Sequence, residues 1–245
     1  YHDDVIDEAD TRRGATSANA NWTNTVAILA GDFLMARASE VAATHLSLES
    51  VRLLAATYAE LVEGQTRELQ LTDDMSHTMK DYLEVIGGKT ASLIRTSARL
   101  GAMAADADPA VVEALSVWAW EVGMVFQIAD DALDLVADEE TIGKPAGSDI
   151  REGTFTAPVL LAAAGPGGDR IRDLLGRGRP YPDETVDEVI RMVRTGGHVE
   201  ETLQSAGKRL EKASRALAEI PESEAHRVLE QLGDYLLHRV EAAQV

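Results

Sequence analysis

The chain carries one acidic pattern twice, an adjacent pair of aspartates followed by a third after two further residues. The copies are Asp3-Asp4-Val5-Ile6-Asp7 and Asp130-Asp131-Ala132-Leu133-Asp134. Both lie in runs that favour a helix, where positions i, i+1 and i+4 share one face, so each copy predicts a ridge of carboxylates. Two such ridges facing each other would bind hard divalent cations, and Mg²⁺ usually completes its shell with substrate phosphates. The doubled pattern therefore predicts chemistry on a diphosphate.

All the aspartates of the two copies are candidate metal ligands, namely Asp3, Asp4, Asp7, Asp130, Asp131 and Asp134. A single copy would suit a solvated acidic helix face equally well. The second copy, together with basic and glycine-rich flanks, favours a functional site.

Cationic residues follow each ridge and also lie between the two. They are found in the segments Asp10–Gly14, Gly88–Ala91 and Thr141–Asp149, which contain Arg12, Arg13, Lys89 and Lys144. Arginine presents a planar fork suited to phosphate, whereas lysine acts as a point charge. One surface cation alone is more often simply solvated. Beside two carboxylate ridges, these cations predict a site for a phosphate-bearing anion.

On these motifs the chain resembles the trans-isoprenyl diphosphate synthases, the polyprenyl synthetase family, from its first residue to about Tyr235. The first aspartate-rich motif and its paired arginines are matched by His2–Asp7 and Arg12-Arg13-Gly14, and the segment that follows by Ala30–Leu34. The middle motifs are similar to Glu63-Gly64-Gln65 and Lys89-Thr90-Ala91. The second aspartate-rich motif and its trailing loop resemble Phe126–Asp134, Gly143-Lys144 and Gly147-Ser148-Asp149.

The resemblance implies an all-α isoprenoid (terpenoid) synthase fold, a helical bundle around a central active-site cavity. Residues 1–245 would form a single polyprenyl synthetase domain. Members of the family usually carry several helices before the first motif, including a segment for isopentenyl diphosphate, and we expect these helices to precede Tyr1 in the complete protein. The family also often has a lysine where this chain has Thr154, so one phosphate contact is absent.

The activity that the resemblance implies is a Mg²⁺-dependent prenyl transfer, with two to three ions at each site. An allylic diphosphate would condense with isopentenyl diphosphate into a longer trans-polyprenyl diphosphate. By resemblance, the catalytic residues are Asp3, Asp7, Asp130, Lys89 and Lys144. The substrate-binding residues would be Arg12, Arg13, Lys89, Thr90, Phe126, Gln127 and Lys144, with Arg13 serving isopentenyl diphosphate.

A long product is favoured by two features. By resemblance, the first motif, with two residues between its second and third aspartates, lacks the longer insertion that is typical of many bacterial short-chain enzymes. Aromatic residues make up only 4% of the chain, which leaves room for a deep apolar tunnel. We therefore expect a long-chain polyprenyl diphosphate.

Two other functions remain open. A class I terpene cyclase shares the helical architecture and the ionisation chemistry, but by resemblance its second metal motif mixes Asn, Ser or Thr and Glu. A non-catalytic subunit of a heteromeric prenyl synthase could dispense with acidic ridges, and both ridges are intact here. The family favours a homodimer, for which the alanine-rich segments Asn24–Thr44 and Leu48–Leu71 are the candidate interface.

Composition narrows the partners. A formal net charge of −19 argues against nucleic-acid binding and would repel a diphosphate unless metals and local cations invert the field. The absence of cysteine excludes disulfides and thiolate metal sites and suits a reducing cytoplasm, where we expect the protein to act. We expect at most peripheral membrane contact, for release of an apolar product.

Periodic apolar residues predict helices over nearly the whole chain. The longest are Asn24–Thr44, Leu48–Leu71, His77–Ala105 and Pro109–Ala137, followed later by Val186–Thr195, His198–Ile220 and Glu222–Ala243. Residues Arg13–Ala20 are predicted to be a polar loop and Gly143–Gly153 the active-site loop, after which Thr156–Ala164 resumes a helix. The sequence shows no convincing strand.

Overall fold

The computed structural model describes residues 1–136 and 145–243 and divides into two compact units. Unit 1 is Tyr1–Ala55 and unit 2 is Ala56–Val245. Helix α4 (Leu48–Leu71) begins in the first and ends in the second. The expectation that the whole chain is a single domain stays a prediction.

Unit 1 contains short elements and one long helix. In chain order they are α1 (His2–Ile6), β1 (Thr11–Arg12), β2 (Ala15–Thr16), α2 (Ala18–Asn21) and α3 (Asn24–His45). The side chains of Ser17 and Thr23 cap the starts of α2 and α3, because each accepts a hydrogen bond from a backbone N–H of the first turn.

The hairpin β1–β2 corrects the expectation of a polar loop without strands. Thr11 pairs with Thr16 and Arg12 with Ala15. The turn residues Arg13 and Gly14 both have positive φ, 53° and 77°, as a tight two-residue hairpin turn requires. Strands of two residues are too short to show an alternating pattern, so only the Arg-Gly turn could have indicated them.

The regular elements of unit 2 are all helices among its described residues. After α4 come α5 (Met79–Ile86), the π-helix η1 (Gly87–Ala91), α6 (Ser92–Ala104), α7 (Pro109–Val136), α9 (Ser148–Arg151), α10 (Ala157–Ala164), α11 (Gly168–Leu175), α12 (Asp183–Thr195), α13 (His198–Leu217) and α14 (Glu224–Ala243). The predicted helices agree with these bounds to within about three residues, except at η1, at α9, which lies within the predicted active-site loop Gly143–Gly153, and at α11, which the sequence analysis did not assign. Between two glycine-containing segments, α11 is only eight residues long and rich in charge.

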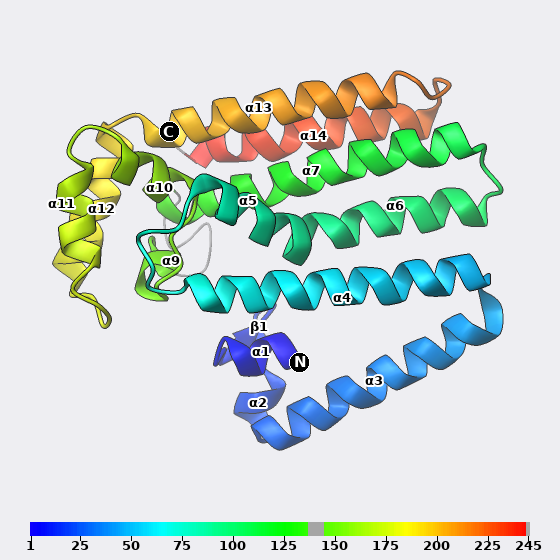
Figure 1. Ribbon diagram of the computed structural model, residues 1–245, viewed down its shortest axis with the longest axis horizontal. Helices are drawn as coiled ribbons and strands as arrows, with labels where there is room; N and C mark the ends of the chain where they lie inside the picture. The colour runs from blue at the N-terminus through cyan, green and yellow to red at the C-terminus, as the bar shows by residue number, and fades with distance from the viewer. Residues whose placement is uncertain (137–144, 244–245) are drawn as a thin grey trace. The chain divides into compact units, whose positions relative to one another are not determined.

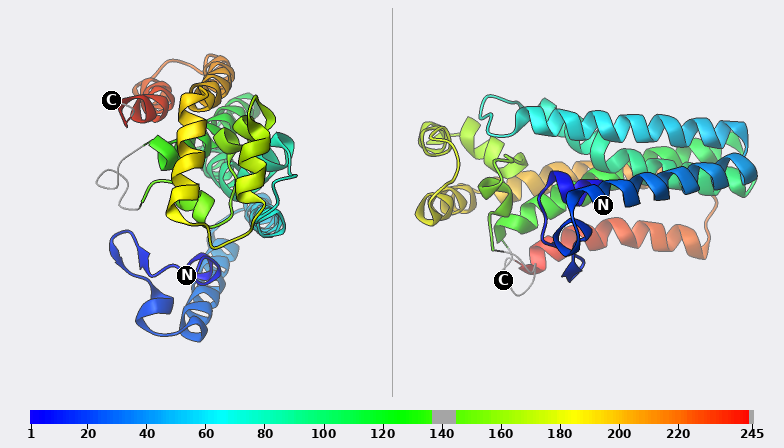
Figure 2. Two further views of the ribbon diagram at one scale, coloured as in Figure 1. Left: turned by 90° about the vertical axis from the view of Figure 1, so that its left-hand side faces the viewer. Right: turned by 90° about the horizontal axis from the view of Figure 1, so that it is seen from below.

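Helix α7 is the centre of unit 2. It packs against α6, α13, α14 and η1, as Figure 1 shows. Ala119, Val125 and Ala132 on α7 are fully buried. Helices α11 and α12 lie across one end of the bundle (Figure 2). By length and composition alone α7 could cross a membrane, but a core helix passes the same test and 56% of that window is buried here.

Two polar contacts fix α7 against its neighbours. The carboxylate of Glu121, only 2% exposed, accepts hydrogen bonds from Arg209 at 2.8 Å and Lys212 at 2.5 Å, both on α13. At the C-terminal end of α7, Arg194 of α12 donates from Nε to the carbonyl of Leu135 at 2.7 Å. A cation at the C-terminal end of a helix complements its dipole, so the end that carries the second acidic motif is anchored.

The π turn η1 interrupts the predicted helix His77–Ala105 because glycines bring three backbones close together. A β-carbon at Gly64 of α4 would lie 2.6 Å from the backbone nitrogen of Lys89. On the other side, a β-carbon at Gly123 of α7 would lie 2.7 Å from Cα of Ala91. Both distances are too short for real carbon contacts, so η1 is held between α4 and α7. π turns often mark functional sites, and this one carries Lys89 and Thr90.

We predict that Gly123→Ala destabilises the protein by about 1–3 kcal/mol, because the added methyl must push η1 away from α7. The matched control is Gly101→Ala on α6, where no atom lies within 4 Å of the new β-carbon. That change should be neutral or stabilising by about 0.5–1 kcal/mol, the usual gain in a helix. Urea unfolding of both variants measures the difference. Equal stabilities for the two would contradict the close contact.

Candidate functional site

The first acidic motif lies on α1 of unit 1, where its aspartates differ in exposure. The side chain of Asp3 is 46% exposed and Asp7 is exposed, whereas Asp4 is buried. Arg12 of the hairpin donates from Nε to Asp4 at 2.5 Å and from Nη2 to Asp3 at 3.0 Å. The hydrogen bond to Asp4 is the main reason why the pKa of Arg12 is raised above its usual value. Arg12, a predicted phosphate ligand, is thus an ion-pair partner of this motif.

The side chain of His2, beside the first motif, contacts α3 at and near the segment Ala30-Gly31-Asp32. Its Nε2 lies 3.0 Å from the carbonyl of Ile28 and 3.2 Å from a carboxylate oxygen of Asp32, both on α3. A β-carbon at Gly31 would lie 2.7 Å from the same nitrogen, so only glycine leaves room for the ring. His2 therefore ties α1 to α3 within unit 1. Arg13, the predicted isopentenyl diphosphate ligand, is exposed at the hairpin turn.

The second acidic motif lies at the end of α7 in unit 2 and is also divided by burial. Asp130 is exposed, whereas Asp131 and Asp134 are only 4% and 3% exposed. Asp131 accepts hydrogen bonds from the Tyr82 hydroxyl at 2.6 Å and from Gln127 Nε2 at 2.8 Å. Asp134 accepts one from the backbone N–H of Asp149, at 3.2 Å, and so holds the start of α9.

The burial of Asp131 changes its acid–base behaviour. Removal from water is the main cause that raises the pKa of Asp131 to about 7, and the hydrogen bonds from Tyr82 and Gln127 oppose that rise. Burial, followed by the nearby charge of Asp131, raises the pKa of Tyr82 well above its usual value. Tyr82 therefore keeps its proton at neutral pH and remains a donor.

Both motifs share one division between their first two aspartates. The first aspartate of each, Asp3 or Asp130, reaches the surface, and the second, Asp4 or Asp131, is buried against donors of the protein. Neighbouring helix positions differ by about 100° in direction, so only one of the two can face solvent fully. The prediction that all six aspartates bind metal remains untested, but this geometry favours the exposed ones.

The donor chemistry fits a hard divalent cation. Carboxylate oxygens are the ligands that Mg²⁺ and Ca²⁺ prefer. Among the described residues, no group of three or more His, Cys, Asp or Glu lies close enough to hold a metal ion by itself.

The cationic turn η1 contacts both of its neighbours. Lys89 Nζ lies 2.6 Å from the Glu68 carboxylate on α4, which also accepts a hydrogen bond from Gln65 at 3.0 Å. The hydroxyl of Thr90 donates to Gln127 Oε1 on α7, at 2.8 Å. Sequence reasoning found Gln65, Lys89 and Thr90 but missed Glu68. The sequence feature that could have indicated Glu68 is its position three residues after Gln65, on the same face of the helix.

Of the remaining predicted residues, Phe126 is 40% exposed beside Gln127 on α7. Lys144 lies outside the described residues. The trailing loop is described again from Pro145, whose carbonyl accepts the Ser148 hydroxyl at 2.9 Å. Thr154, at the position of the usual lysine, precedes a buried Phe155, so the effect of losing that lysine stays a prediction.

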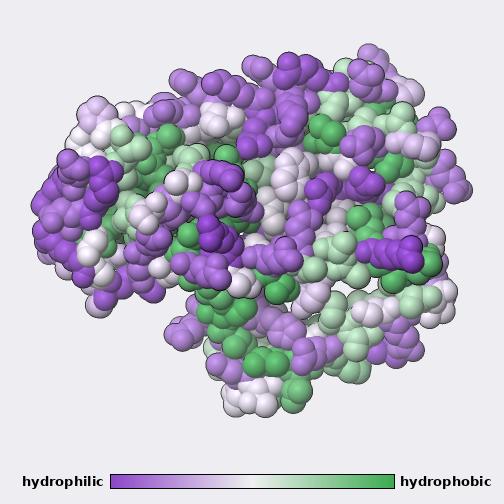
Figure 3. All heavy atoms as spheres, in the orientation of Figure 1, coloured by the Kyte–Doolittle hydropathy of each residue, from purple (hydrophilic) through white to green (hydrophobic). Residues whose placement is uncertain are grey.

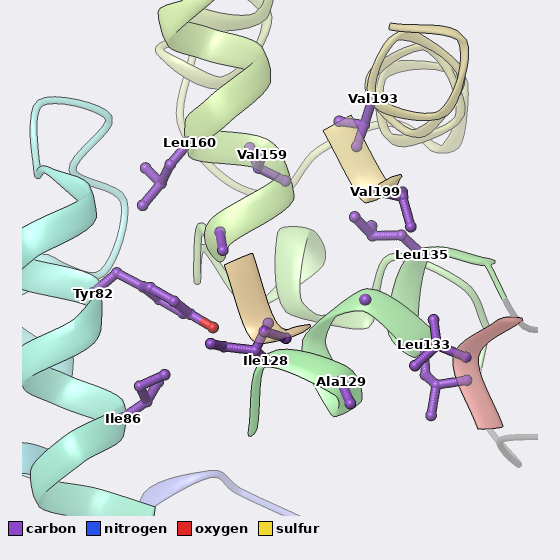
Figure 4. Packing of buried hydrophobic residues seen from close by; sticks show 14 of the residues in the cluster. Tyr82, Ile86, Ile128, Ala129, Leu133, Leu135, Val159, Leu160, Val193 and Val199 are labelled. Carbon is purple, nitrogen blue, oxygen red and sulfur yellow. The ribbon is translucent and has the colours of Figure 1, made fainter. Parts of the chain in front are cut away.

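Tyr82 was also missed by the sequence analysis. It lies on the buried face of the amphipathic helix α5, with Val85 and Ile86, and its ring belongs to the hydrophobic core of unit 2. Figure 4 shows its hydroxyl pointing toward the part of α7 that carries Ile128. A buried tyrosine needs a hydrogen-bond partner for its hydroxyl, and this need was the available indication in the sequence. The partner, however, lies 49 residues away.

Comparisons with known proteins agree with this picture. The chain is 42% identical to nonaprenyl diphosphate synthase of Mycobacterium tuberculosis, over 98% of this chain and 71% of that protein. It is 36% identical to heptaprenyl diphosphate synthase component 2 of Geobacillus stearothermophilus, over 96% and 73%.

Among solved structures, the chain superimposes with a TM-score of 0.88 and 36% identity on a polyprenyl synthase of Caulobacter crescentus, complexed with calcium and isoprenyl diphosphate, over 96% of this chain and 73% of that one. The all-α isoprenoid synthase fold is thereby confirmed. The sequence pattern described as Polyprenyl synthetase matches residues 1–193. Fold, motifs and relatives together show that this chain belongs to the polyprenyl synthetase family.

Proposed function

We propose that the protein condenses an allylic diphosphate with isopentenyl diphosphate into a long-chain trans-polyprenyl diphosphate, with the help of divalent metal ions. One observation in unit 2 carries the proposal. The acidic end of α7 is joined to the cationic turn η1 through Gln127, which hydrogen-bonds both Asp131 and Thr90. Exposed Asp130 and the residues Lys89 and Thr90 therefore belong to one connected assembly of carboxylate, ammonium and hydroxyl groups.

This assembly suits the departure of a diphosphate. Negative charge grows on the leaving group as the allylic carbon–oxygen bond breaks, and fixed cations stabilise that charge more in the transition state than in the ground state. Lys89 would supply such a charge once it exchanges Glu68 for phosphate oxygens. Arg12, now paired with Asp3 and Asp4, would make the same exchange in unit 1.

Asp3, Asp7 and Asp130 are the proposed metal ligands because they reach the surface. A bound divalent cation supplies Lewis-acid stabilisation of the leaving diphosphate. We propose Mg²⁺, which takes oxygen ligands and keeps positions open for phosphate. Asp4, Asp131 and Asp134 would instead hold the motifs in place through their hydrogen bonds with the protein.

The long product and the assembly state are also proposals, and the names of relatives bear on both. The relative from Mycobacterium tuberculosis named as a nonaprenyl diphosphate synthase supports a long product. The relative from Geobacillus stearothermophilus is named as a component of its synthase, so a heteromeric synthase is the alternative to a homodimer. The cytoplasmic location stays a prediction.

We propose a homodimer, with α3 in its interface. The apolar residues of this helix are not confined to one face, and only Ala27 among its residues is buried. Figure 3 shows apolar side chains at the surface over unit 1. The exposed apolar residues on α3 are Val26, Ile28, Leu29, Phe33, Leu34, Met35 and Val41. Exposed apolar side chains that lie so close together are normally covered, and a second copy supplies a matching apolar surface.

We predict that the complete protein with Mg²⁺ consumes farnesyl and isopentenyl diphosphate together and that mass analysis shows a long polyprenyl product. Asp130→Asn and Asp3→Asn should each lower turnover at least about 100-fold while the circular dichroism spectrum is unchanged, because each removes an exposed metal ligand. The control is Asp234→Asn, which changes an exposed carboxylate on α14.

Three results would argue against this assignment. Near-normal turnover of Asp130→Asn would remove that residue from the metal site. A cyclised product formed without isopentenyl diphosphate would indicate a terpene cyclase. Turnover that appears only after a second subunit is added would indicate a component of a heteromeric synthase.

We predict that the complete protein sediments as a dimer at micromolar concentration, since stable interfaces bury well over about 1,000 Å². Phe33→Asp should shift it toward monomer by placing a charge in the apolar face of α3. The control is Val228→Asp, which introduces the same charge at an exposed valine of α14. A wild-type protein that remains monomeric, or a Phe33→Asp variant that stays dimeric, would exclude α3 as the interface.

A further inference from the structure

A line of hydrogen bonds runs from the core of unit 2 to the turn η1. The Tyr82 hydroxyl donates to Asp131 Oδ2 at 2.6 Å, and Gln127 Nε2 donates to Asp131 Oδ1 at 2.8 Å. The Thr90 hydroxyl then donates to Gln127 Oε1 at 2.8 Å. The line joins α5, α7 and η1, whose side chains lie up to 49 residues apart in sequence.

We propose that Tyr82 is a positioning residue for the prenyl transfer, because it sets the orientation of the Thr90 hydroxyl through Asp131 and Gln127. This inference rests on the proposed function and assigns Tyr82 a part in it. Tyr82 itself is too deep to be a catalytic residue, since its ring is enclosed in the core with Ile86 and Ile128 (Figure 4).

The direction of each bond follows from the donors and acceptors available. In its ionised form the Asp131 carboxylate only accepts, and the structure places a donor at each of its two oxygens. Tyr82 supplies one and the amide nitrogen of Gln127 supplies the other. Gln127 must therefore turn its carbonyl oxygen toward Thr90, and the Thr90 hydroxyl must donate. Thr90 then presents lone pairs rather than its proton to any group in front of it, which suits the positive charge that develops on the allylic carbon as the diphosphate leaves.

Burial makes the line rigid. Tyr82 and Asp131 are 5% and 4% exposed, so water cannot easily replace either donor of Asp131. Thr90 is only half-buried and forms the reachable end. Without the Tyr82 hydroxyl, Asp131 would lose one of its two donors and could turn away from Gln127. The amide of Gln127 would then be released to rotate, and the Thr90 hydroxyl with it.

The effect should fall on the rate of the chemical step rather than on substrate binding. Lys89, Arg12 and the metal ligands hold the diphosphate in the ground state in the proposed function. The orientation of one hydroxyl matters most where charge develops, so its loss lowers kcat more than it raises KM. For one hydrogen bond of ordinary strength we expect a loss of about tenfold in kcat.

The test is a double-mutant cycle on the complete protein with farnesyl and isopentenyl diphosphates and Mg²⁺. Tyr82→Phe removes only the hydroxyl at one end of this line of hydrogen bonds. Thr90→Val removes only the hydroxyl at its other end. We expect Tyr82→Phe to lower kcat about tenfold with little change in either KM. In the Thr90→Val background the same change should have no further effect, because the group through which Tyr82 acts is already gone.

The control is Tyr181→Phe, which removes a tyrosine hydroxyl that donates to the carbonyl of Leu175 away from this line. It should leave kcat unchanged. Thermal unfolding of every variant separates lost rate from lost fold. Losses in kcat that multiply in the double variant, or a Tyr82→Phe enzyme with normal kcat, would overturn the role of Tyr82.

A second readout does not need activity. The side-chain amide of Gln127 should give a nuclear magnetic resonance signal that moves in Tyr82→Phe and in Thr90→Val but not in Tyr181→Phe. An unmoved signal in Tyr82→Phe would overturn the inference by itself. An inactive wild-type protein whose Gln127 signal still moves would overturn the proposed function and leave the connection from Tyr82 to Gln127 standing.

Discussion

The close contact of α7 with the π turn η1 is the constraint on which unit 2 depends. Gly123 lets α7 touch the backbone of Ala91, and Gly64 lets α4 touch the backbone of Lys89. A side chain at either glycine would overlap backbone atoms that cannot move independently. The turn is therefore held between two helices, and Thr90 comes within hydrogen-bonding distance of Gln127. The burial of α7, whose neighbours cover it along much of its length, keeps this arrangement in place.

Burial then decides what each aspartate can do. Asp131 is held by Tyr82 and Gln127, and Asp4 is held by Arg12, so both are committed to the protein. Their neighbours Asp130 and Asp3 reach the surface, where a cation with its phosphates could bind. In the proposed function, an adjacent pair of aspartates on one helix would thus combine an anchor with a metal ligand.

The sequence predicted what local patterns determine. Helix Leu48–Leu71 was predicted with its observed bounds because its amphipathic pattern is long and regular. The π turn was not predicted, because it depends on close packing against the backbones of α4 and α7, which the residues Gly87-Gly88 alone do not reveal. The hairpin Thr11–Thr16 was not predicted either, because its strands are too short to show an alternating hydrophobic pattern. The link from Gln127 to Asp131 was available from their spacing of four residues, whereas Tyr82 could be joined to Asp131 only by the fold.

The division between anchoring and metal-binding aspartates is the central claim, and one measurement tests it directly. Crystals of the complete protein grown with Mn²⁺ and inorganic diphosphate would locate the metal by its anomalous scattering. The account predicts Mn²⁺ within about 2.5 Å of an Asp130 oxygen, with Asp131 still bonded to Tyr82 and Gln127. Mn²⁺ bound to Asp131, with Tyr82 displaced from it, would contradict the account.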